Sequence, residues 1–216
     1  MFANRTEAGH MLAQALAAYG TGGARADQNA IVLGIPRGGV VVAAEVAHAL
    51  SLPLDVVVAT KVSMPANPEY AVGAVAPDGE VLANPVSGVL ADEVRRLAGP
   101  AHAKSAHELA MFRAGLAPMD LEGHTAIVVD DGLATGLTAL AAVQYLRRVG
   151  ADEIVLAVPV AAPSAVRALT PYVDELVVLD ASPGFSAVGQ FYSSFGQTQD
   201  AEVLALLGQA AGRTIL

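Results

Sequence analysis

The chain has no cysteine and no tryptophan, and aromatic residues make up only 5% of its 216 residues. Without cysteine it can form no disulfide, no thiolate metal site and no thiol nucleophile. Apolar residues nevertheless make up 54% of the sequence, so we expect a core of alanine, valine and leucine. A chain of this length is expected to fold as one domain, over residues 1–216, with a substantial core.

Positive charge is also scarce, with 12 Lys and Arg against 21 Asp and Glu and a net charge of −9. This balance argues against nucleic acid as the main partner. The N-terminus, MFANRTEAGH, lacks the apolar stretch of a signal peptide. The most apolar long stretch, residues 38–60, is interrupted by Glu45, His48, Pro53 and Asp55, so no membrane span is expected. We therefore expect a cytoplasmic protein without a membrane partner.

Short apolar runs typical of buried strands alternate with segments that have the apolar spacing of helices. The runs lie at residues 31–35, 54–60, 127–129, 153–158 and 175–179, and helices are expected at 6–19, 39–50, 138–149, 164–169 and 200–207. A further segment, 87–115, is mostly helical but broken near Gly99 and Pro100. Such alternation predicts an α/β fold, a parallel sheet of about five strands with helices on both faces.

Two stretches depart from this alternation. Residues 62–86 are punctuated by Pro, Asn and Gly, and Pro77-Asp78-Gly79 is typical of a hairpin turn. Residues 181–199 are irregular and hold three of the chain's five phenylalanines. We expect the first stretch to be a mobile loop with a hairpin.

The most informative segment is residues 127–138, Ile-Val-Val-Asp-Asp-Gly-Leu-Ala-Thr-Gly-Leu-Thr. It lies where an expected strand ends and a helix begins, which is the usual ligand crevice of an open α/β sheet. Asp130 and Asp131 would emerge at the strand tip, within reach of two vicinal hydroxyls. The alternative is a strand–turn–helix whose acids merely cap the helix.

The loop after these acids has the composition of a phosphate cradle. Backbone N–H groups of residues 134–138 would face outward, next to a helix N-terminus and the hydroxyls of Thr135 and Thr138. A P-loop nucleotide site is excluded, because no Lys-Ser or Lys-Thr follows. Acids that bind hydroxyls beside a phosphate site indicate a sugar phosphate as the ligand.

This segment resembles the phosphoribosyl pyrophosphate (PRPP) signature of type I phosphoribosyltransferases, Asp-Asp-Val-Leu-Ala-Thr-Gly-Gly-Thr. Gly132 replaces the usual Val and Leu137 the second Gly, while the remaining positions match. The whole chain is similar to a bacterial group of stand-alone predicted phosphoribosyltransferases with unassigned acceptors. The resemblance implies a type I phosphoribosyltransferase fold, with residues 181–199 as a small C-terminal hood.

The resemblance also implies an activity, the transfer of the 5-phosphoribosyl group of PRPP to a nitrogen nucleophile with release of pyrophosphate. Asp130 and Asp131 would hold the ribose hydroxyls. The 5′-phosphate would be held by five consecutive residues, Ala134, Thr135, Gly136, Leu137 and Thr138. Mg²⁺ is the implied cofactor, bound mainly by substrate oxygens and water, with the two aspartates acting indirectly.

A second loop, Pro36-Arg37-Gly38-Gly39, also follows a strand and opens a helix. Glycine lets the backbone approach an anion closely, and Arg37 can fork onto phosphate oxygens. A structural turn is the alternative. In type I enzymes the corresponding loop binds pyrophosphate, often with a cis peptide before the basic residue. The resemblance therefore implies that Arg37, Gly38 and Gly39 bind pyrophosphate and that the Pro36–Arg37 bond is cis.

The resemblance assigns catalytic roles to Lys61 and Glu69, together with Arg37. Lys61 would end the second strand and neutralise the leaving group, although a surface lysine whose stem covers apolar surface is the alternative. Met64 stands near the place of a further lysine in related enzymes. Glu69, with the tyrosine after it, resembles the Glu-Tyr pair in the mobile loop of adenine phosphoribosyltransferases.

Residue 134 bears on the identity of the acceptor, because it lacks a carboxylate. In 6-oxopurine enzymes the matching position is an aspartate that bonds the purine, which Ala134 cannot do. Phe185, Val188 and Tyr192 would instead form an apolar-walled acceptor pocket, in which Phe185 or Tyr192 could stack on a ring, although plain packing of the hood accounts for them equally well. We expect a small neutral heterocycle, adenine-like first, which indicates nucleotide metabolism and purine salvage.

Other functions remain open at this point. A non-catalytic PRPP-sensing regulator of the same fold is one, because the loop cations are depleted. A sugar-phosphate binding module of unrelated chemistry is another, but it would need the signature to be a coincidence. A DNA-binding regulator would show a basic stripe, which this acidic chain lacks. We further expect a homodimer.

Overall fold

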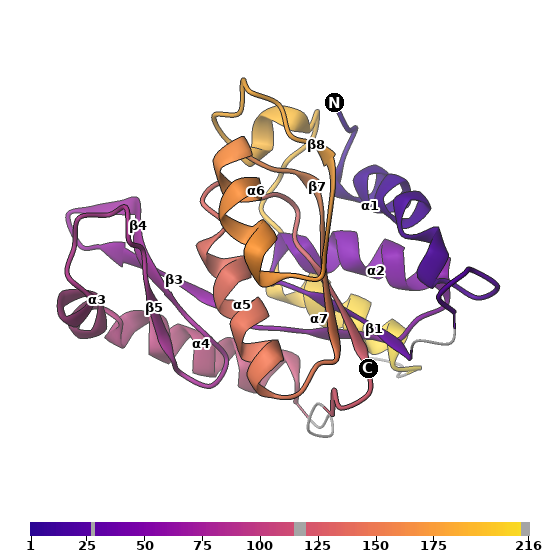
Figure 1. Cartoon of the computed structure of the whole chain (residues 1–216), viewed down its shortest axis with the longest axis horizontal. Coiled ribbons are helices and arrows are strands. Elements are labelled where there is room, and N and C mark those ends of the chain that lie inside the picture. The colour runs from indigo at the N-terminus through magenta and orange to yellow at the C-terminus, as the bar shows by residue number, and fades with distance from the viewer. Residues whose placement is uncertain (27–28, 115–119, 213–216) are drawn as a thin grey trace.

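A five-stranded parallel sheet forms the centre of the computed structural model, which describes residues 1–26, 29–114 and 120–212 and not the side chains of residues 68–69 (Figure 1). The strand order is β2–β1–β6–β7–β8. The bounds are Ala30–Gly34 for β1, Leu54–Val56 for β2, Thr125–Val129 for β6, Glu153–Val160 for β7 and Glu175–Asp180 for β8. The predicted sheet is therefore confirmed, and its switch point lies between β1 and β6, where ligands bind in such sheets.

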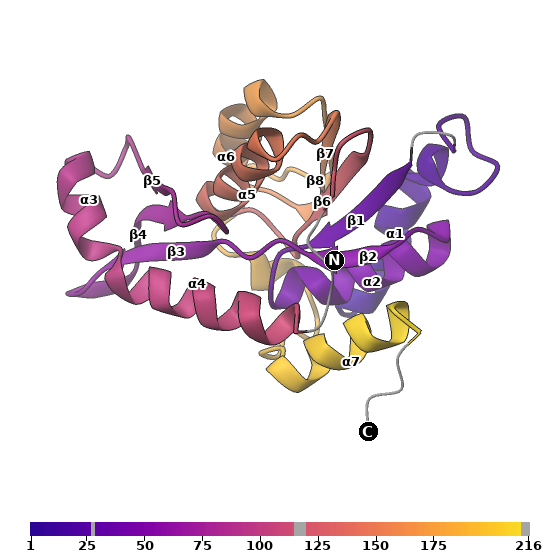
Figure 2. The ribbon, with the colours of Figure 1, turned by 90° about the horizontal axis from the view of Figure 1, so that it is seen from below.

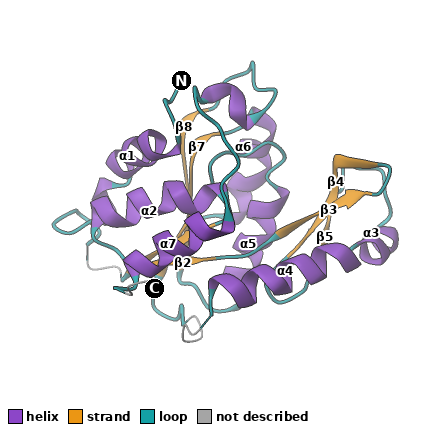
Figure 3. Ribbon diagram, turned by 180° about the vertical axis from the view of Figure 1, so that it is seen from behind, coloured by secondary structure: helices purple, strands orange, loops and turns teal. Residues whose placement is uncertain are grey.

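Helices cover both faces of this sheet (Figures 1 and 3). One face carries α1, α2 and α7 (Arg5–Ala15, Gly38–Leu50 and Asp200–Ala210), and the other carries α5 and α6 (Leu137–Arg148 and Pro163–Leu169). All five residues of β6 are buried, as expected of a parallel strand covered on both faces. Its alternate side chains enter different cores, Ala126 and Val128 on the α5 side and Ile127 and Val129 on the α1 and α2 side.

A second, antiparallel sheet extends to one side of the main sheet (Figure 2). It consists of β3, β4 and β5 (Thr60–Met64, Asn67–Val75 and Val81–Ala83) and packs against α3 and α4 (Ala91–Leu97 and Gly99–Phe112). Its small core contains Val62, Val72 and Val94. The predicted hairpin and the predicted helix break near Gly99 are confirmed.

The predicted strand over residues 54–60 is wrong in its extent. β2 ends at Val56, because its partner β1 ends at Gly34, whose carbonyl accepts the last bond, from Val57 N at 3.1 Å. The chain then leaves the main sheet, and Thr60 and Lys61 begin β3.

The N-terminal residues pair with the segment that follows β8. Residues 181–199 are irregular except for the short 3₁₀ helix η3, Val188–Phe191. Phe2 bridges to Tyr192, with Phe2 N donating to Phe191 O at 2.7 Å and Ser193 N to Phe2 O at 2.8 Å. The hood, residues 181–199, is therefore completed by the N-terminal residues.

The first helix differs from its prediction at both ends. It begins at Arg5, because the Asn4 side chain accepts from Glu7 N at 2.9 Å and caps it in place of Thr6. The helix ends at Ala15, and a separate 3₁₀ turn, η1 (Ala17–Tyr19), follows. None of the helices in the described ranges has both the length and the apolarity to cross a membrane.

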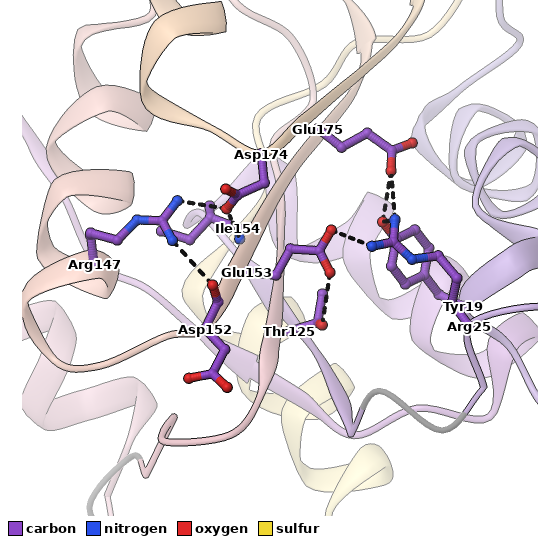
Figure 4. Close-up of polar contacts among 9 residues, drawn as sticks. All are labelled: Tyr19, Arg25, Thr125, Arg147, Asp152, Glu153, Ile154, Asp174 and Glu175. Atoms are coloured by element: carbon purple, nitrogen blue, oxygen red, sulfur yellow. Dashed lines mark hydrogen bonds and ion pairs between the residues drawn. The ribbon is translucent and has the colours of Figure 1, made fainter.

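Polar side chains tie together the strand starts at the amino edge of the main sheet (Figure 4). Arg25 pairs with Glu153 and Glu175, the first residues of β7 and β8, and Tyr19 donates to Glu175 at 2.7 Å. Because this network occupies the amino edge, it fixes the sheet from the side opposite the loops that follow β1 and β6.

Candidate active site

Two loops meet at the carboxyl edge of the sheet. Gly34 and Val129, the last residues of β1 and β6, lie side by side in register, and Ile35 N donates to Val129 O at 2.9 Å. Asp130 and Asp131 follow β6 directly, and residues 36–39 follow β1. The sequence prediction that both loops reach the same edge is confirmed.

Glycine is required where these loops touch. A Cβ added to Gly38 would lie 2.0 Å from Asp131 Oδ2, and one added to Gly39 would lie 2.9 Å from Asp130 Oδ1. Both separations are shorter than real Cβ contacts, so these positions let the two aspartates seat against the loop. The Pro36–Arg37 peptide is cis, as the resemblance predicts.

Both carboxyl groups of the aspartate pair have raised pKa values, because both are buried. Burial raises the pKa of Asp130 well above its ordinary value, and the charge of Asp131 raises that pKa further. Asp131 N donates a hydrogen bond to Asp130 Oδ1 at 2.8 Å, which offsets this rise only in part. Burial also raises the pKa of Asp131, while Arg5 opposes that rise. Ligand hydroxyls that donate to these carboxylates would favour their charged forms.

The loop after the acids has the geometry of an anion cradle. Leu133 N donates to Val160 O at 2.9 Å, which anchors its base on β7. Gly136 has a φ of 75° and caps α5, and Leu140 N donates to its carbonyl at 2.8 Å. The N–H groups of residues 137–139 therefore precede the first intrahelical bond, while Ala134 and Thr135 are exposed.

A family model for the phosphoribosyl transferase domain matches residues 7–180. The chain belongs to the phosphoribosyl transferase domain family. It is 43% identical, over 97% of its length, to a Mycobacterium tuberculosis H37Rv protein named "Putative phosphoribosyl transferase Rv0571c". It spans 47% of the length of that relative, about half.

A solved structure supports the same fold over almost the whole chain. The crystal structure of TT1426 from Thermus thermophilus matches with a TM-score of 0.79 and 39% identity, covering 97% of this chain and 98% of that one. A purine phosphoribosyltransferase from Pyrococcus horikoshii is more distant, at 18% identity, a TM-score of 0.46 and coverage of 85% and 91% of the two chains.

The departure from the family signature at Gly132 has a physical reason. A Cβ there would lie 2.6 Å from Cγ2 of Val160 and 2.6 Å from Cγ1 of Val188. The hood residue Val188 therefore fills space that a valine at position 132 would need. Signature loop and hood are shaped to each other.

The three residues of the expected acceptor pocket differ in exposure. Phe185 and Val188 are half-buried, and the Phe185 ring centroid lies 5.4 Å from that of Phe191. Tyr192 is buried, its hydroxyl donates to Asp131 O at 2.7 Å, and its ring contacts Phe2 and Phe195. In this structure Tyr192 positions the signature backbone, and little of its ring is open to an acceptor.

The cations and the acid predicted for catalysis are more dispersed. Arg37 Nη1 lies 3.4 Å from Asp200 Oδ1. Lys61 was expected to end a strand of the main sheet, and this is wrong. Because β2 is short, Lys61 lies in β3, opposite Ala74. The backbone at Glu69 belongs to β4, and its side chain lies outside the described part of the structure.

One residue that the sequence reasoning missed is Arg5, the first residue of α1. Its Nε donates to Asp131 Oδ2 at 2.7 Å and its Nη1 to Gly196 O at 2.8 Å. It also lines a cavity of about 370 Å³ together with Arg37, Gly38 and Phe195. No local sequence pattern predicts this contact, because Arg5 and Asp131 are 126 positions apart in the chain.

Proposed function

We propose that this protein transfers the 5-phosphoribosyl group of PRPP to a nitrogen of a small neutral heterocycle and releases pyrophosphate. The observation that carries the proposal is one carboxyl edge that brings together an aspartate pair, a cradle of N–H groups and a glycine loop. Asp130 and Asp131 would hold the ribose hydroxyls, and residues 134–138 the 5′-phosphate. Family membership supports this assignment.

The leaving group would lie along the other loop. Gly38 and Gly39 let this loop lie directly against the aspartates, and Arg37 lines the adjoining cavity. Lys61 is proposed as a further cation for the pyrophosphate. In the reaction the acceptor nitrogen bonds to C1 while the bond between C1 and the pyrophosphate oxygen breaks. The electron pair of that broken bond leaves with pyrophosphate. The site's work is therefore to position the two reactants and stabilise the charge that develops on the leaving oxygens.

The donor set is compatible with Mg²⁺ held mainly by the substrate. Among the described residues no group of three or more His, Asp or Glu could hold a metal ion. Asp130 and Asp131 offer hard carboxylate oxygens, which suit an ion that keeps several waters and binds substrate phosphates. Bound Mg²⁺ would supply positive charge to the pyrophosphate oxygens.

We rank candidate acceptors by the chemistry of the residues proposed to line the acceptor pocket. Ala134 offers no group for a 6-oxopurine, and the half-buried Phe185 and Val188 supply apolar surface. Glu69 is proposed to take the proton that the nitrogen loses. Because burying an unpaired carboxylate is costly, orotate is disfavoured. We rank adenine-like bases first, other neutral nitrogen heterocycles second, and orotate, hypoxanthine and guanine last.

Two observations favour a second function, a regulator that binds PRPP without turning it over. Arg37 is engaged by Asp200, and Lys61 lies in β3 instead of at the main-sheet edge. Such a protein would keep the ribose and phosphate sites and lack efficient leaving-group stabilisation.

A role in purine salvage would place the enzyme in the cytoplasm, and we propose that it acts as a homodimer. The decisive experiment measures pyrophosphate release from Mg²⁺-PRPP with a panel of nucleobases. The proposal expects turnover that is fastest with adenine or a related neutral base. Faster turnover with hypoxanthine or orotate would overturn the acceptor ranking, and PRPP binding without any turnover would favour the regulator.

A further inference from the structure

Arg5 contacts both the signature and the hood with one guanidinium group. Nε donates to Asp131 Oδ2 at 2.7 Å, Nη1 donates to Gly196 O at 2.8 Å, and Cζ lies 3.9 Å from the centroid of the Phe195 ring. The Arg5 side chain is only 13% exposed and that of Asp131 16%. A contact this sheltered is worth more than an ion pair on the open surface.

The N-terminal segment is built to deliver Arg5 to this place. Residues Phe2 and Ala3 accept backbone bonds from Ser193 and Ser194 at 2.8 and 2.9 Å. Asn4 then caps α1, so that the chain turns into the helix with Arg5 as its first residue. The arginine is therefore held from two directions, by the helix and by pairing with the hood.

The hood also reaches the same aspartate by a second route. Tyr192 OH donates to Asp131 O at 2.7 Å, and the Tyr192 ring stacks on Phe195 with centroids 5.0 Å apart. Arg5 covers the Phe195 ring and binds the Asp131 side chain. Backbone and side chain of Asp131 are thus both tied to residues 192–196.

Resting on the proposed function, we infer that Arg5 is a positioning residue that orients the Asp131 carboxylate toward the ribose hydroxyls and couples the hood to PRPP binding. Nε binds Oδ2, so Oδ1 and the remaining lone pair of Oδ2 can accept from the substrate. A site that orders its acid before the substrate arrives binds that substrate more tightly. PRPP binding and the order of residues 190–198 then depend on each other through this guanidinium.

Three variants separate this role from a structural one. Arg5→Met keeps an unbranched stem over Phe195 and removes the charge and both donors. Arg5→Lys keeps the charge but cannot fork to Asp131 and Gly196 at once. Arg96→Met is the matched control, because it removes an arginine from α3 whose partner, Glu93, is three residues away on the same helix.

The first readout is steady-state kinetics. Arg5→Met is expected to raise the KM for PRPP by roughly tenfold or more, the scale of a lost charged hydrogen bond, with a smaller change in the KM for the acceptor. Arg5→Lys should fall between Arg5→Met and the wild type. Arg96→Met should behave as the wild type. A KM for PRPP within twofold of wild type in folded Arg5→Met would overturn the inference.

The second readout is hydrogen exchange over residues 190–198, which needs no turnover. Without ligand, Arg5→Met and Arg5→Lys should both exchange faster there than wild type, and Mg²⁺-PRPP should protect the segment only in wild type. If Arg5→Met fails to fold, Arg5→Lys decides by the same comparison. Wild-type protein that does not bind PRPP would refute the proposed function, whereas PRPP-dependent protection that persists in the Arg5 variants would refute this inference alone.

Discussion

Replacing Gly38 by alanine places a methyl group where the structure has no room. The new Cβ would lie 2.0 Å from Asp131 Oδ2 and 2.8 Å from Arg5 Nε, and both groups belong to one ion pair. Contacts under 3.0 Å are essentially never seen for real Cβ atoms, so the carboxylate must move by about 1 Å or more. That movement breaks the 2.7 Å bond to Arg5.

The cost follows from overpacking. Forcing an extra carbon into a packed site typically costs about 1–3 kcal/mol. For a chain of this size each kcal/mol lowers Tm by about 2–4 °C, so Gly38→Ala should lower Tm by roughly 2–12 °C. The rise in Tm that Mg²⁺-PRPP causes by mass action should also largely disappear, because Asp131 is displaced.

Gly99→Ala is the matched control for this experiment. Gly99 is also the first residue of a helix, α4, and an added Cβ there meets nothing within 4 Å. The substitution removes freedom from the unfolded chain without a clash, so Tm should stay unchanged or rise. The assay is differential scanning fluorimetry of both variants with and without Mg²⁺-PRPP. If Gly38→Ala keeps both the wild-type Tm and the full ligand-induced rise, the close approach of loop and acid is refuted.

Three further predictions follow from charge and from the second sheet. Burial raises the pKa of Asp130 in the folded state, so the charged carboxylate destabilises the fold. This destabilisation is absent below the unfolded-state pKa of about 3.9 and grows as pH rises toward the folded-state pKa. Asp130→Asn should therefore raise the ligand-free Tm at neutral pH while reducing the PRPP-induced rise, and a lower ligand-free Tm would contradict this. Burial alone would raise the pKa of Asp174, but the Ile154 N–H and Arg147 lower it, so its stabilisation is present above about pH 3.9 and is lost as pH falls further. Asp174→Asn should lower Tm modestly at pH 7, with the difference from wild type shrinking on acidification, and a difference that grew would be inconsistent. Residues 62–86, expected to form a mobile loop, should exchange amide hydrogens faster than the main sheet and gain protection with Mg²⁺-PRPP, and equal exchange with and without the ligand would show that PRPP does not order them.

Local patterns were sufficient to predict the elements that position the site. The buried runs of β1 and β6 each lead into a loop and a helix, and this was readable because parallel strands buried on both faces are continuously apolar. The hairpin at Pro77-Asp78-Gly79 was equally readable, because turn residues constrain the backbone locally. The cis Pro36–Arg37 peptide came from the family resemblance and not from local pattern.

The errors arose where the outcome depends on distant partners. Val57 to Ala59 are as apolar as the strand before them, yet β2 ends at Val56 because β1 provides no further partner. Thr6 is an adequate cap by type, but pairing of the N-terminus with the hood sets Asn4 in that place. Arg5 was missed for the same reason, since its contacts at Asp131 and Gly196 exist only once the chain has folded.

The most direct test of the central claim is titration calorimetry with Mg²⁺-PRPP on the wild type and on the double variant Asp130→Asn/Asp131→Asn. The account predicts saturable binding at one site per chain in the wild type. It also predicts that the double variant, with its fold intact by circular dichroism, loses most of that affinity. A wild type that does not bind PRPP, or a double variant that binds it equally well, would contradict the assignment of this carboxyl edge as a PRPP site.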